Sequence, residues 1–387
     1  MFRRLSAILL ASIMILSLTA CGGPKADDGE GPIIIGHQVA LTGGSALWGE
    51  SEKFAIDMEV EKINAAGGVL GRPIEVKRYD NKADQTEAVN VANKLVADGA
   101  IAIIGPAQSG VAIAATSITE PAKVILIGTT TTNTKVTVED DGTLHPYNFR
   151  TCFIDPYQGQ VAATFAFNDL GSKKAAILID VGSDYSQGLA ENFVKTYEGL
   201  GGEIVANEAF RSEELDYRAQ LGKIKEAAPD LLFIPTMQKE AGLAMKQARE
   251  LGLECDFLGG DAWASKELIE LGGEATEGCY YVNIASLEDP AIAEWVDEYN
   301  AKWGKDPVMP NPVLAVDALH MIVAAIEATE STDPTVLAAY METMTGVPVL
   351  TGILNIDPAT HNPVGKPAVI ETVKDGEFVF YKGIAAA

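Results

Sequence analysis

The alternation of short apolar runs with helical patterns constrains the fold of this chain more than any other feature. In the first third, buried strands are expected at residues 33–36, 74–79, 101–104 and 124–127. Helices whose apolar residues recur every three or four positions are expected between them, at 50–66, 88–96 and 110–120. Parallel strands need such crossover helices, and strands buried on both faces have continuous apolar sequences. The pattern therefore predicts βαβ units around a parallel sheet.

The same pattern restarts after about residue 150. Further strands are expected at 175–179, 203–206, 231–234, 256–258 and 280–282. The helices expected between or before them are 157–169, 186–199, 217–227 and 239–251. The remaining chain is expected to form helices 290–303, 313–328 and 334–344, then strands near 350–356, 368–374 and 377–381. The fold class predicted is α/β with two doubly wound lobes, and the late helices indicate that the chain crosses back to the first lobe.

The N-terminus has the pattern of an export signal. Arg3 and Arg4 precede an apolar run at 5–18, which is too short for an ordinary transmembrane helix. The run ends in Leu-Thr-Ala-Cys at Cys21, a tetrapeptide that resembles the bacterial lipoprotein box. We therefore expect residues 1–20 to be a lipoprotein signal peptide, Cys21 to carry lipid, and residues 21–32 to form a flexible tether. The alternatives are a generic secretory signal with an incidental cysteine, or an uncleaved anchor.

The charge of the chain excludes one class of partner. The 387 residues carry 29 basic and 54 acidic side chains, a formal net charge of −25. Removal of residues 1–20 would take away two arginines and no acid, which makes the net charge −27. Nucleic-acid binding needs concentrated positive charge, so no nucleic-acid partner is expected.

Motifs for catalysis, metal binding and cofactor binding are missing from the sequence. The four histidines are far apart, and G-x-S-x-G, the phosphate-loop motif and G-x-G-x-x-G do not occur. We therefore expect a non-enzyme with no cofactor and no metal. After Cys21, the remaining cysteines are Cys152, Cys255 and Cys279, whose spacing matches no zinc pattern. One disulfide among them and three buried free thiols both remain open.

Candidate binding residues lie in loops that follow the expected strands, where ligands bind in open α/β sheets. The four loops are 41–49 with Trp48, 105–110 with Ala107, Gln108 and Ser109, 129–133 with Thr130, Thr131 and Thr132, and 259–263 with Asp261. The second loop opens a helix, so it offers a hydroxyl and free backbone N–H groups to an anion. Asp261 supplies one fixed negative charge beside an aromatic residue. Together these groups would complement a zwitterion with an apolar side chain.

Several segments resemble one known family. The stretch 63–76, Ile-Asn-Ala-Ala-Gly-Gly-Val-Leu-Gly-Arg-Pro-Ile-Glu-Val, is similar to the hallmark of the periplasmic leucine/isoleucine/valine-binding protein family, the type I solute-binding proteins of ABC importers. Further similar segments are Asp80 with the helix 88–96, Ile104-Gly105-Pro106, Arg150 with Asp155 and Gln158-Gly159, 184–188, 247–252 and Gly260-Asp261. The resemblance runs from about residue 33 to the C-terminus.

The resemblance implies two lobes joined by a three-strand hinge and closed over a ligand. The domains it implies are 33–151 plus 284–366 for the N-terminal lobe, and 152–283 plus 367–387 for the C-terminal lobe. It also implies a monomer that captures an amino acid, with an aliphatic or branched-chain one expected. The partner would be an ABC transporter permease, and the location extracytoplasmic, anchored to the bacterial membrane through Cys21.

The resemblance also implies roles for individual residues. Ser109 and Thr132 would bind the ligand α-carboxylate, while the Thr130 carbonyl and the Asp261 carboxylate would take the α-ammonium. The remaining expected binding residues are pocket-wall and loop positions, namely Trp48, Ala107, Gln108, Thr131, Tyr185 and Met237.

Three departures from the family pattern leave the ligand open. Asp261 stands where branched-chain binders usually carry glutamate, and Met237-Gln238 stands where they carry an aromatic residue. Asn81 and Gln108 stand at about the places of the family's disulfide cysteines. The alternatives are therefore an amide, an aromatic acid or another carboxylate as ligand, or a sensory protein that passes on cleft closure.

Overall fold

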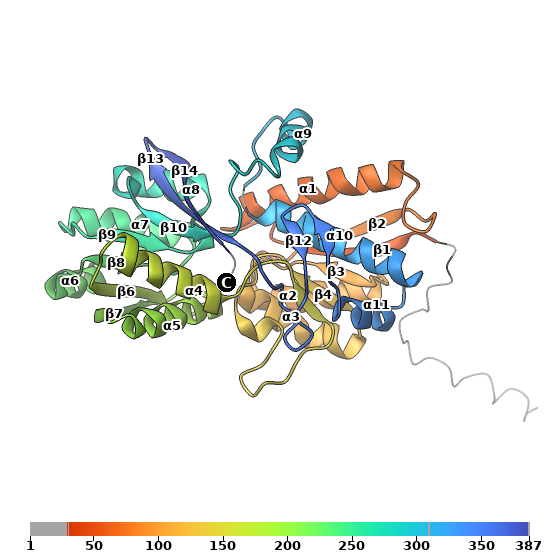
Figure 1. The fold of residues 1–387 in the computed structure, drawn as a ribbon, viewed down its shortest axis with the longest axis horizontal. Coiled ribbons are helices and arrows are strands. Elements are labelled where there is room, and N and C mark those ends of the chain that lie inside the picture. The colour runs from red at the N-terminus through yellow and green to blue at the C-terminus, as the bar shows by residue number, and fades with distance from the viewer. Residues whose placement is uncertain (1–28, 30, 309, 386–387) are drawn as a thin grey trace, which may run out of the picture.

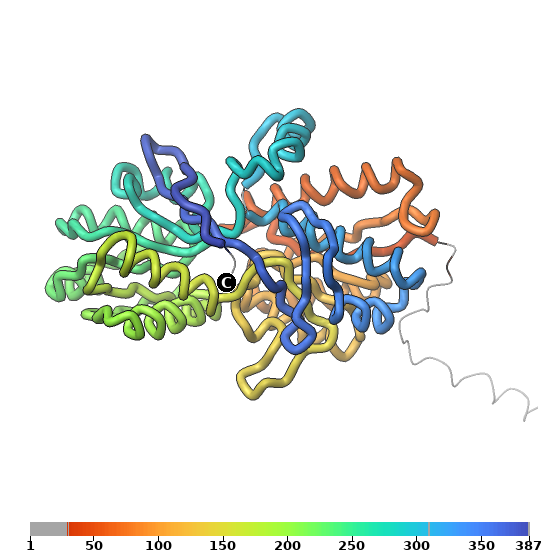
Figure 2. The backbone as a smooth tube through the Cα atoms, in the orientation of Figure 1, coloured from red at the N-terminus to blue at the C-terminus, as the bar shows by residue number. Residues whose placement is uncertain are grey.

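The described chain forms two α/β lobes side by side, each built on one sheet (Figures 1 and 2). The structure is a computed structural model that describes residues 29, 31–308 and 310–385. The expected signal peptide 1–20, the expected lipid site Cys21 and most of the expected tether 21–32 lie outside the described residues. The predicted fold class, two doubly wound lobes of the type I periplasmic binding protein kind, is confirmed.

The sheet of the first lobe is parallel, with strand order β2-β1-β3-β4-β5. Its strands are β1 (Ile33–Val39), β2 (Ile74–Asp80), β3 (Ala102–Ile104), β4 (Ile125–Gly128) and β5 (Asn148–Arg150). Its helices are α1 (Ala46–Ala65), α2 (Gln85–Ala97), α3 (Ser109–Ala122), α10 (Asn311–Thr329) and α11 (Pro334–Met341). Successive strand residues point to opposite faces, so Ile104 packs in the core with α1 and α10 while Ile103 packs with α2 and α3.

The sheet of the second lobe has the order β14-β13-β10-β9-β8-β6-β7. Its strands are β6 (Lys174–Asp180), β7 (Glu203–Phe210), β8 (Leu231–Phe233), β9 (Asp256–Gly259), β10 (Tyr280–Asn283), β13 (Ala368–Lys374) and β14 (Glu377–Ile384). Its helices are α4 (Asp155–Thr164), α5 (Asp184–Gly199), α6 (Arg218–Ala227), α7 (Gln238–Glu250) and α8 (Lys266–Gly272). The strands β6 to β10 are parallel, and β13 and β14 add antiparallel pairs at one edge.

The chain crosses between the two sheets three times, after β5, after β10 and before β13. Hydrogen bonds join two of these crossings at Glu371. Its carboxylate accepts from the Tyr281 hydroxyl, the Asn283 amide and the Ser286 hydroxyl, each at 2.7 Å. Helix α9 (Ala293–Trp303) follows the second crossing and packs against α1. The domain boundaries given above, which assign each segment to one lobe, stay a prediction.

Some element boundaries differ from those expected. Helix α1 begins at Ala46, so Trp48 lies in the first helical turn instead of in a loop. The expected strand near 350–356 is a hairpin of two short strands, β11 (Val347–Val349) and β12 (Gly352–Leu354), because the chain turns at 350–351. The expected helix 157–169 is α4 followed by a π-helical turn at Phe165–Asp169.

Helix α10 has the apolar sequence of a core helix. Within the described residues it is the one helix long and apolar enough to cross a membrane. Most of its residues are buried, and it packs against α1 over one face of the first sheet. Burial on nearly all sides explains its composition, since a helix that is apolar all round belongs in a core.

Candidate ligand-binding cleft

A cavity of about 330 Å³ lies between the lobes, where the parallel strands of both sheets end. Of the ten expected binding residues, eight line it, namely Trp48, Ala107, Gln108, Ser109, Thr130, Tyr185, Met237 and Asp261. These residues are separated by up to about 200 positions in the sequence, and only the packing of the two sheets brings them together. The other two expected residues, Thr131 and Thr132, have fully buried side chains that are not part of the cavity lining.

Asp261 is the buried carboxylate of the second lobe's wall. It begins a short 3-10 turn directly after β9 and is 4% exposed. Its Oδ1 accepts hydrogen bonds from Gln158 Nε2 at 2.8 Å and from the Tyr185 hydroxyl at 3.0 Å. Burial raises the pKa of Asp261 to about 6, although these two hydrogen bonds act in the opposite direction. A buried carboxylate held by neutral donors lacks a positive partner, and a ligand cation would supply one.

Gly260 leaves room for this arrangement, which yields a testable prediction. A Cβ at Gly260 would stand 2.4 Å from the Tyr185 hydroxyl and 2.8 Å from Gln158 Nε2, the two donors to Asp261. Gly260→Ala is therefore expected to displace both donors and to weaken ligand binding at least tenfold. Isothermal titration measures this. Gly199→Ala is the matched control, because a Cβ there meets nothing within 4 Å. Equal affinities of the two variants would contradict the assigned geometry.

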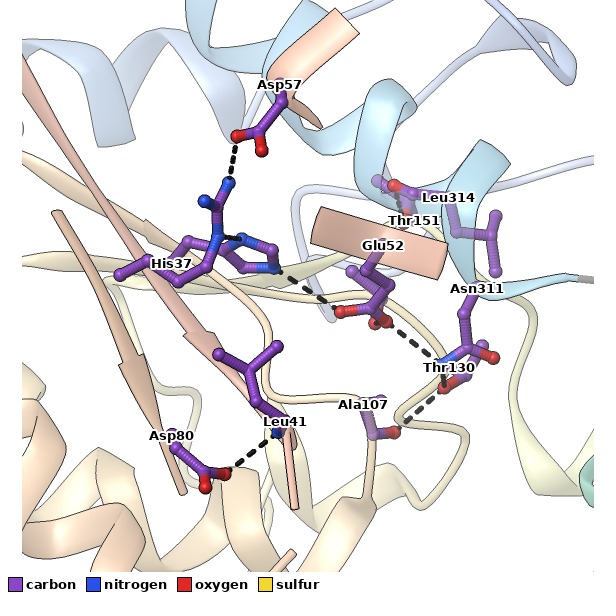
Figure 3. A network of polar contacts seen from close by, with 12 residues as sticks. His37, Leu41, Glu52, Asp57, Asp80, Ala107, Thr130, Thr151, Asn311 and Leu314 are labelled. Carbon is purple, nitrogen blue, oxygen red and sulfur yellow. Dashed lines mark hydrogen bonds and ion pairs between the residues drawn. The ribbon is translucent and has the colours of Figure 1, made fainter. Parts of the chain in front are cut away.

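The first lobe's wall is made by the loops after β3 and β4. Ser109 is the first residue of α3, is 1% exposed, and accepts a hydrogen bond from the Asn133 N–H at 3.2 Å. The Thr130 hydroxyl donates to the Ala107 carbonyl at 3.0 Å, which ties the two loops together (Figure 3). The Thr130 carbonyl accepts from the Thr132 N–H at 3.1 Å and keeps a second lone pair for another donor.

Direct contacts across the cleft hold the lobes close together. The Asn133 side-chain amide of the first lobe donates to the Asp184 carbonyl of the second at 2.7 Å. Gln238 Nε2 donates to the Gly44 carbonyl at 3.1 Å. Trp48 and Tyr185, one from each lobe, are buried in one apolar cluster. Both lobes therefore contact each other across the cleft, and each contributes apolar surface to the cavity wall.

Several residues of the cavity lining were not expected from the sequence. Asn311 belongs to α10, far along the chain from the strand-end loops, and no local pattern marks it. Asp180 ends β6, so the rule that ligands bind at strand ends could have indicated it. The lining also carries charged residues from both lobes, namely Lys82, Asp184, Glu213, Lys239 and Glu240.

The described residues hold no group of three or more His, Cys, Asp and Glu side chains that could bind a metal ion. Cys152, Cys255 and Cys279 are free and buried, which decides the question that their spacing left open. Burial raises the pKa of Cys152 and Cys279 to about 12 and that of Cys255 to about 11. Thiols protonated to this extent are poor nucleophiles.

Comparison with known proteins finds relatives over most of the chain. The family model described as periplasmic binding protein matches residues 32–377. A Leu/Ile/Val-binding protein homolog 2 of Brucella abortus is 30% identical over 370 residues, 95% of this chain and 96% of the relative. The leucine-binding protein LivK of Thermotoga maritima superposes with a TM-score of 0.84 at 31% identity, over 91% of this chain and 99% of that one.

Similar structures hold different ligands. LivJ of Streptococcus pneumoniae, a branched-chain amino acid transporter substrate-binding protein in complex with isoleucine, has a TM-score of 0.80 at 29% identity, over 92% of this chain and 99% of that one. A solute-binding protein of an ABC transporter from Rhodopseudomonas palustris BisB5, in complex with 3,4-dihydroxybenzoic acid, has a TM-score of 0.80 at 26% identity, over 92% and 98%. With the fold, the cleft and these matches together, the chain belongs to the periplasmic leucine/isoleucine/valine-binding protein family, whose members are solute-binding proteins of transporters.

Proposed function

We propose that this protein captures an amino acid with an aliphatic side chain in the cleft between its lobes. The observation that carries the proposal is the environment of Asp261. Its carboxylate is buried on the cavity wall, takes part in no ion pair among the described residues, and accepts from the neutral donors of Gln158 and Tyr185. The α-ammonium of an amino acid would pair with this charge, and a pair buried together with its hydrogen bonds costs far less than a lone buried ion.

The opposite wall suits the other end of the same ligand. The Ser109 hydroxyl and the N-terminus of α3 supply donors and a partial positive charge for the α-carboxylate. The Thr130 carbonyl has a free lone pair for the ammonium. Trp48, Tyr185 and Met237 offer apolar surface to the side chain. A contact with Gln108 remains part of the proposal, and Thr131 and Thr132, whose side chains lie outside the cavity lining, would contribute through the backbone of their loop.

A role in transport would follow from this capture step. We propose delivery of the ligand to an ABC importer permease by a monomer that is held outside the cytoplasm by lipid on Cys21. The similarity to LivJ and to the Brucella homolog supports delivery of a branched-chain amino acid. A sensory protein would use the same capture step and would report cleft closure to a membrane partner instead.

The dihydroxybenzoate complex of the Rhodopseudomonas protein favours one second candidate, an aromatic acid. Such a ligand has a carboxylate for Ser109 and aromatic surface for Trp48 and Tyr185. It has no cation for Asp261, so it would leave that carboxylate without a positive partner. For this reason the amino acid is the function that the geometry supports best.

Thermal unfolding with a ligand panel tests the proposal. Protein that begins at Gly22, stripped of bound ligand by unfolding and refolding, is melted with each amino acid and with benzoate and 3,4-dihydroxybenzoate. One or a few aliphatic amino acids at a hundredfold excess over Kd are expected to stabilise it by about 2.7 kcal/mol. Mass spectrometry of small molecules released from the freshly purified protein gives an independent answer. If only aromatic acids raise the melting temperature, the second candidate replaces the first.

A further inference from the structure

A buried polar network lies beneath the first lobe's wall of the cleft, with Glu52 at its centre (Figure 3). Glu52 belongs to α1, is 1% exposed, and is not part of the cavity lining. It is therefore a buried acid that the proposed capture of a ligand does not use directly. Its partners, however, lead to residues that do line the cavity.

One oxygen of Glu52 holds the cleft side of the network. Oε1 accepts from the Thr129 hydroxyl at 3.0 Å and from Asn311 Nδ2 at 2.9 Å. Asn311 lines the cavity, and its Nδ2 also lies 3.4 Å from the hydroxyl of Thr130, the next residue after Thr129. The Thr130 hydroxyl in turn donates to the Ala107 carbonyl. A single carboxylate thus fixes three segments of the wall, namely the loops after β3 and β4 and the start of α10.

The other oxygen faces a histidine whose tautomer follows from its second partner. Arg78 Nε donates to His37 Nδ1 at 2.8 Å, so the ring proton of neutral His37 is on Nε2. That Nε2 lies 3.5 Å from Glu52 Oε2 and points its proton toward it. Arg78 is itself paired with Asp57 at 2.6 Å. All partners of Glu52 are therefore donors, and the ionised carboxylate is the form that matches them.

We infer that Glu52 is a positioning residue for the first lobe's ligand-binding wall. Its ionised form holds this wall in the arrangement that binds ligand, so ligand affinity rises with pH across neutrality. The inference rests on the proposed capture of an amino acid in the cleft. The inference adds to that proposed function a role for a residue outside the cavity lining and a dependence of ligand affinity on pH.

Protonation of Glu52 would break the pattern of donors around it. The new O–H has to donate, and among its hydrogen-bonded neighbours only the Thr129 hydroxyl oxygen can accept. Burial raises the pKa of Glu52 to about 7, although the bonds from Asn311 and Thr129 and the charge of Arg78 lower it. Both forms are therefore populated near neutral pH.

The charged groups around the network come from three elements. His37 on β1 faces Glu52 directly, Arg78 on β2 lies behind it, and Lys53 and Asp57 on α1 flank Arg78 and His37. Burial and the charges of Arg78 and Lys53 hold the pKa of His37 well below its usual range, so it stays neutral near pH 7. Glu52 is therefore the group of this network that changes charge there.

Binding of L-leucine, measured by calorimetry between about pH 6 and pH 8, tests the inference. If only the ionised form of Glu52 is competent, its pKa near 7 by itself makes binding about tenfold weaker at pH 6 than at pH 8. Glu52→Gln keeps an acceptor for Thr129 and Asn311 but cannot ionise, so this part of the pH profile should disappear. Asp155 and Asp261, whose burial raises their pKa values to about 8 and about 6, are present in both proteins, so the difference between the profiles isolates Glu52.

Two further variants keep the result interpretable. Glu61→Gln changes an exposed carboxylate of the same helix, which pairs with Lys302, and should keep the native profile. Thr129→Val removes one donor to the ionised form, so the midpoint of the profile should move to higher pH even if Glu52→Gln fails to fold. An unchanged profile in Glu52→Gln or Thr129→Val would overturn the inference alone. Absence of amino-acid binding in every protein at every pH would overturn the proposed function, and the inference with it.

Discussion

Replacing Asp261 by alanine is expected to weaken amino-acid binding by about 2–5 kcal/mol, or roughly 30-fold to several-thousand-fold. The ammonium of the ligand would then lose the buried carboxylate of Asp261 as its negatively charged partner on the cavity wall. It would also have to leave water without a compensating charge. Calorimetry of ligand-free protein with the amino acid selected by thermal unfolding measures the loss.

Asp261→Asn separates the charge from the shape. The amide oxygen can still accept from Gln158 and Tyr185, so the wall keeps its geometry while the negative charge is removed.

Because burial raises the pKa of Asp261 from 3.8 to about 6, the folded protein holds the proton of this carboxyl more tightly than the unfolded chain does. Ionised Asp261 therefore lowers stability as the pH rises from about 4 to 6. Ligand-free Asp261→Asn is expected to be at least as stable as the native protein at pH 7, yet to bind amino acids weakly. Native affinity in this variant would remove Asp261 from its assigned role.

Replacing Arg150 by alanine is expected to lower the free energy of unfolding by about 3 kcal/mol or more. Arg150 ends β5 and is fully buried. Its guanidinium donates to the Thr131 carbonyl, to the Thr134 carbonyl at 3.4 Å and to the Thr137 hydroxyl at 3.1 Å. Alanine would leave these acceptors unsatisfied and would open a cavity behind the loop that carries Thr130.

Urea unfolding measures this loss, with Arg218→Ala as the control. Arg218 is about half exposed and pairs with Asp216 and Glu250 on the surface, so its removal should cost about 0.5 kcal/mol or less. An unfolding free energy of Arg150→Ala within that range of the native value would show that the loop does not depend on the buried guanidinium.

The fold could be predicted from the sequence because strand and helix leave different local patterns. The runs at 101–104 and 124–127 are apolar at every position, which is what burial on both faces of a parallel sheet requires. The start of α1 was predicted four residues too late, because 41–49 is rich in glycine and small residues and has no apolar period. Trp48 was consequently assigned to a loop, although its place on the cavity wall does not depend on that assignment.

The candidate site could be predicted where its residues follow strands, as Ser109, Thr130 and Asp261 do. Asn311 and Glu52 could not be predicted, because they lie on helices and meet the loops only through tertiary packing. Their sequence surroundings are those of ordinary helices. The full burial of the Thr132 side chain could not be predicted either, because the direction of a side chain in a tight loop depends on backbone angles that composition does not determine.

The central claim, capture of a zwitterionic amino acid, is tested most directly by a matched pair of ligands. L-leucine and 4-methylpentanoate share the carboxylate and the branched side chain, and differ only in the ammonium group. In calorimetry with ligand-free protein at pH 8, leucine is expected to bind at least a hundredfold more tightly, because only leucine gives Asp261 a positive partner. Equal binding of the two, or tighter binding of 4-methylpentanoate, would contradict the account.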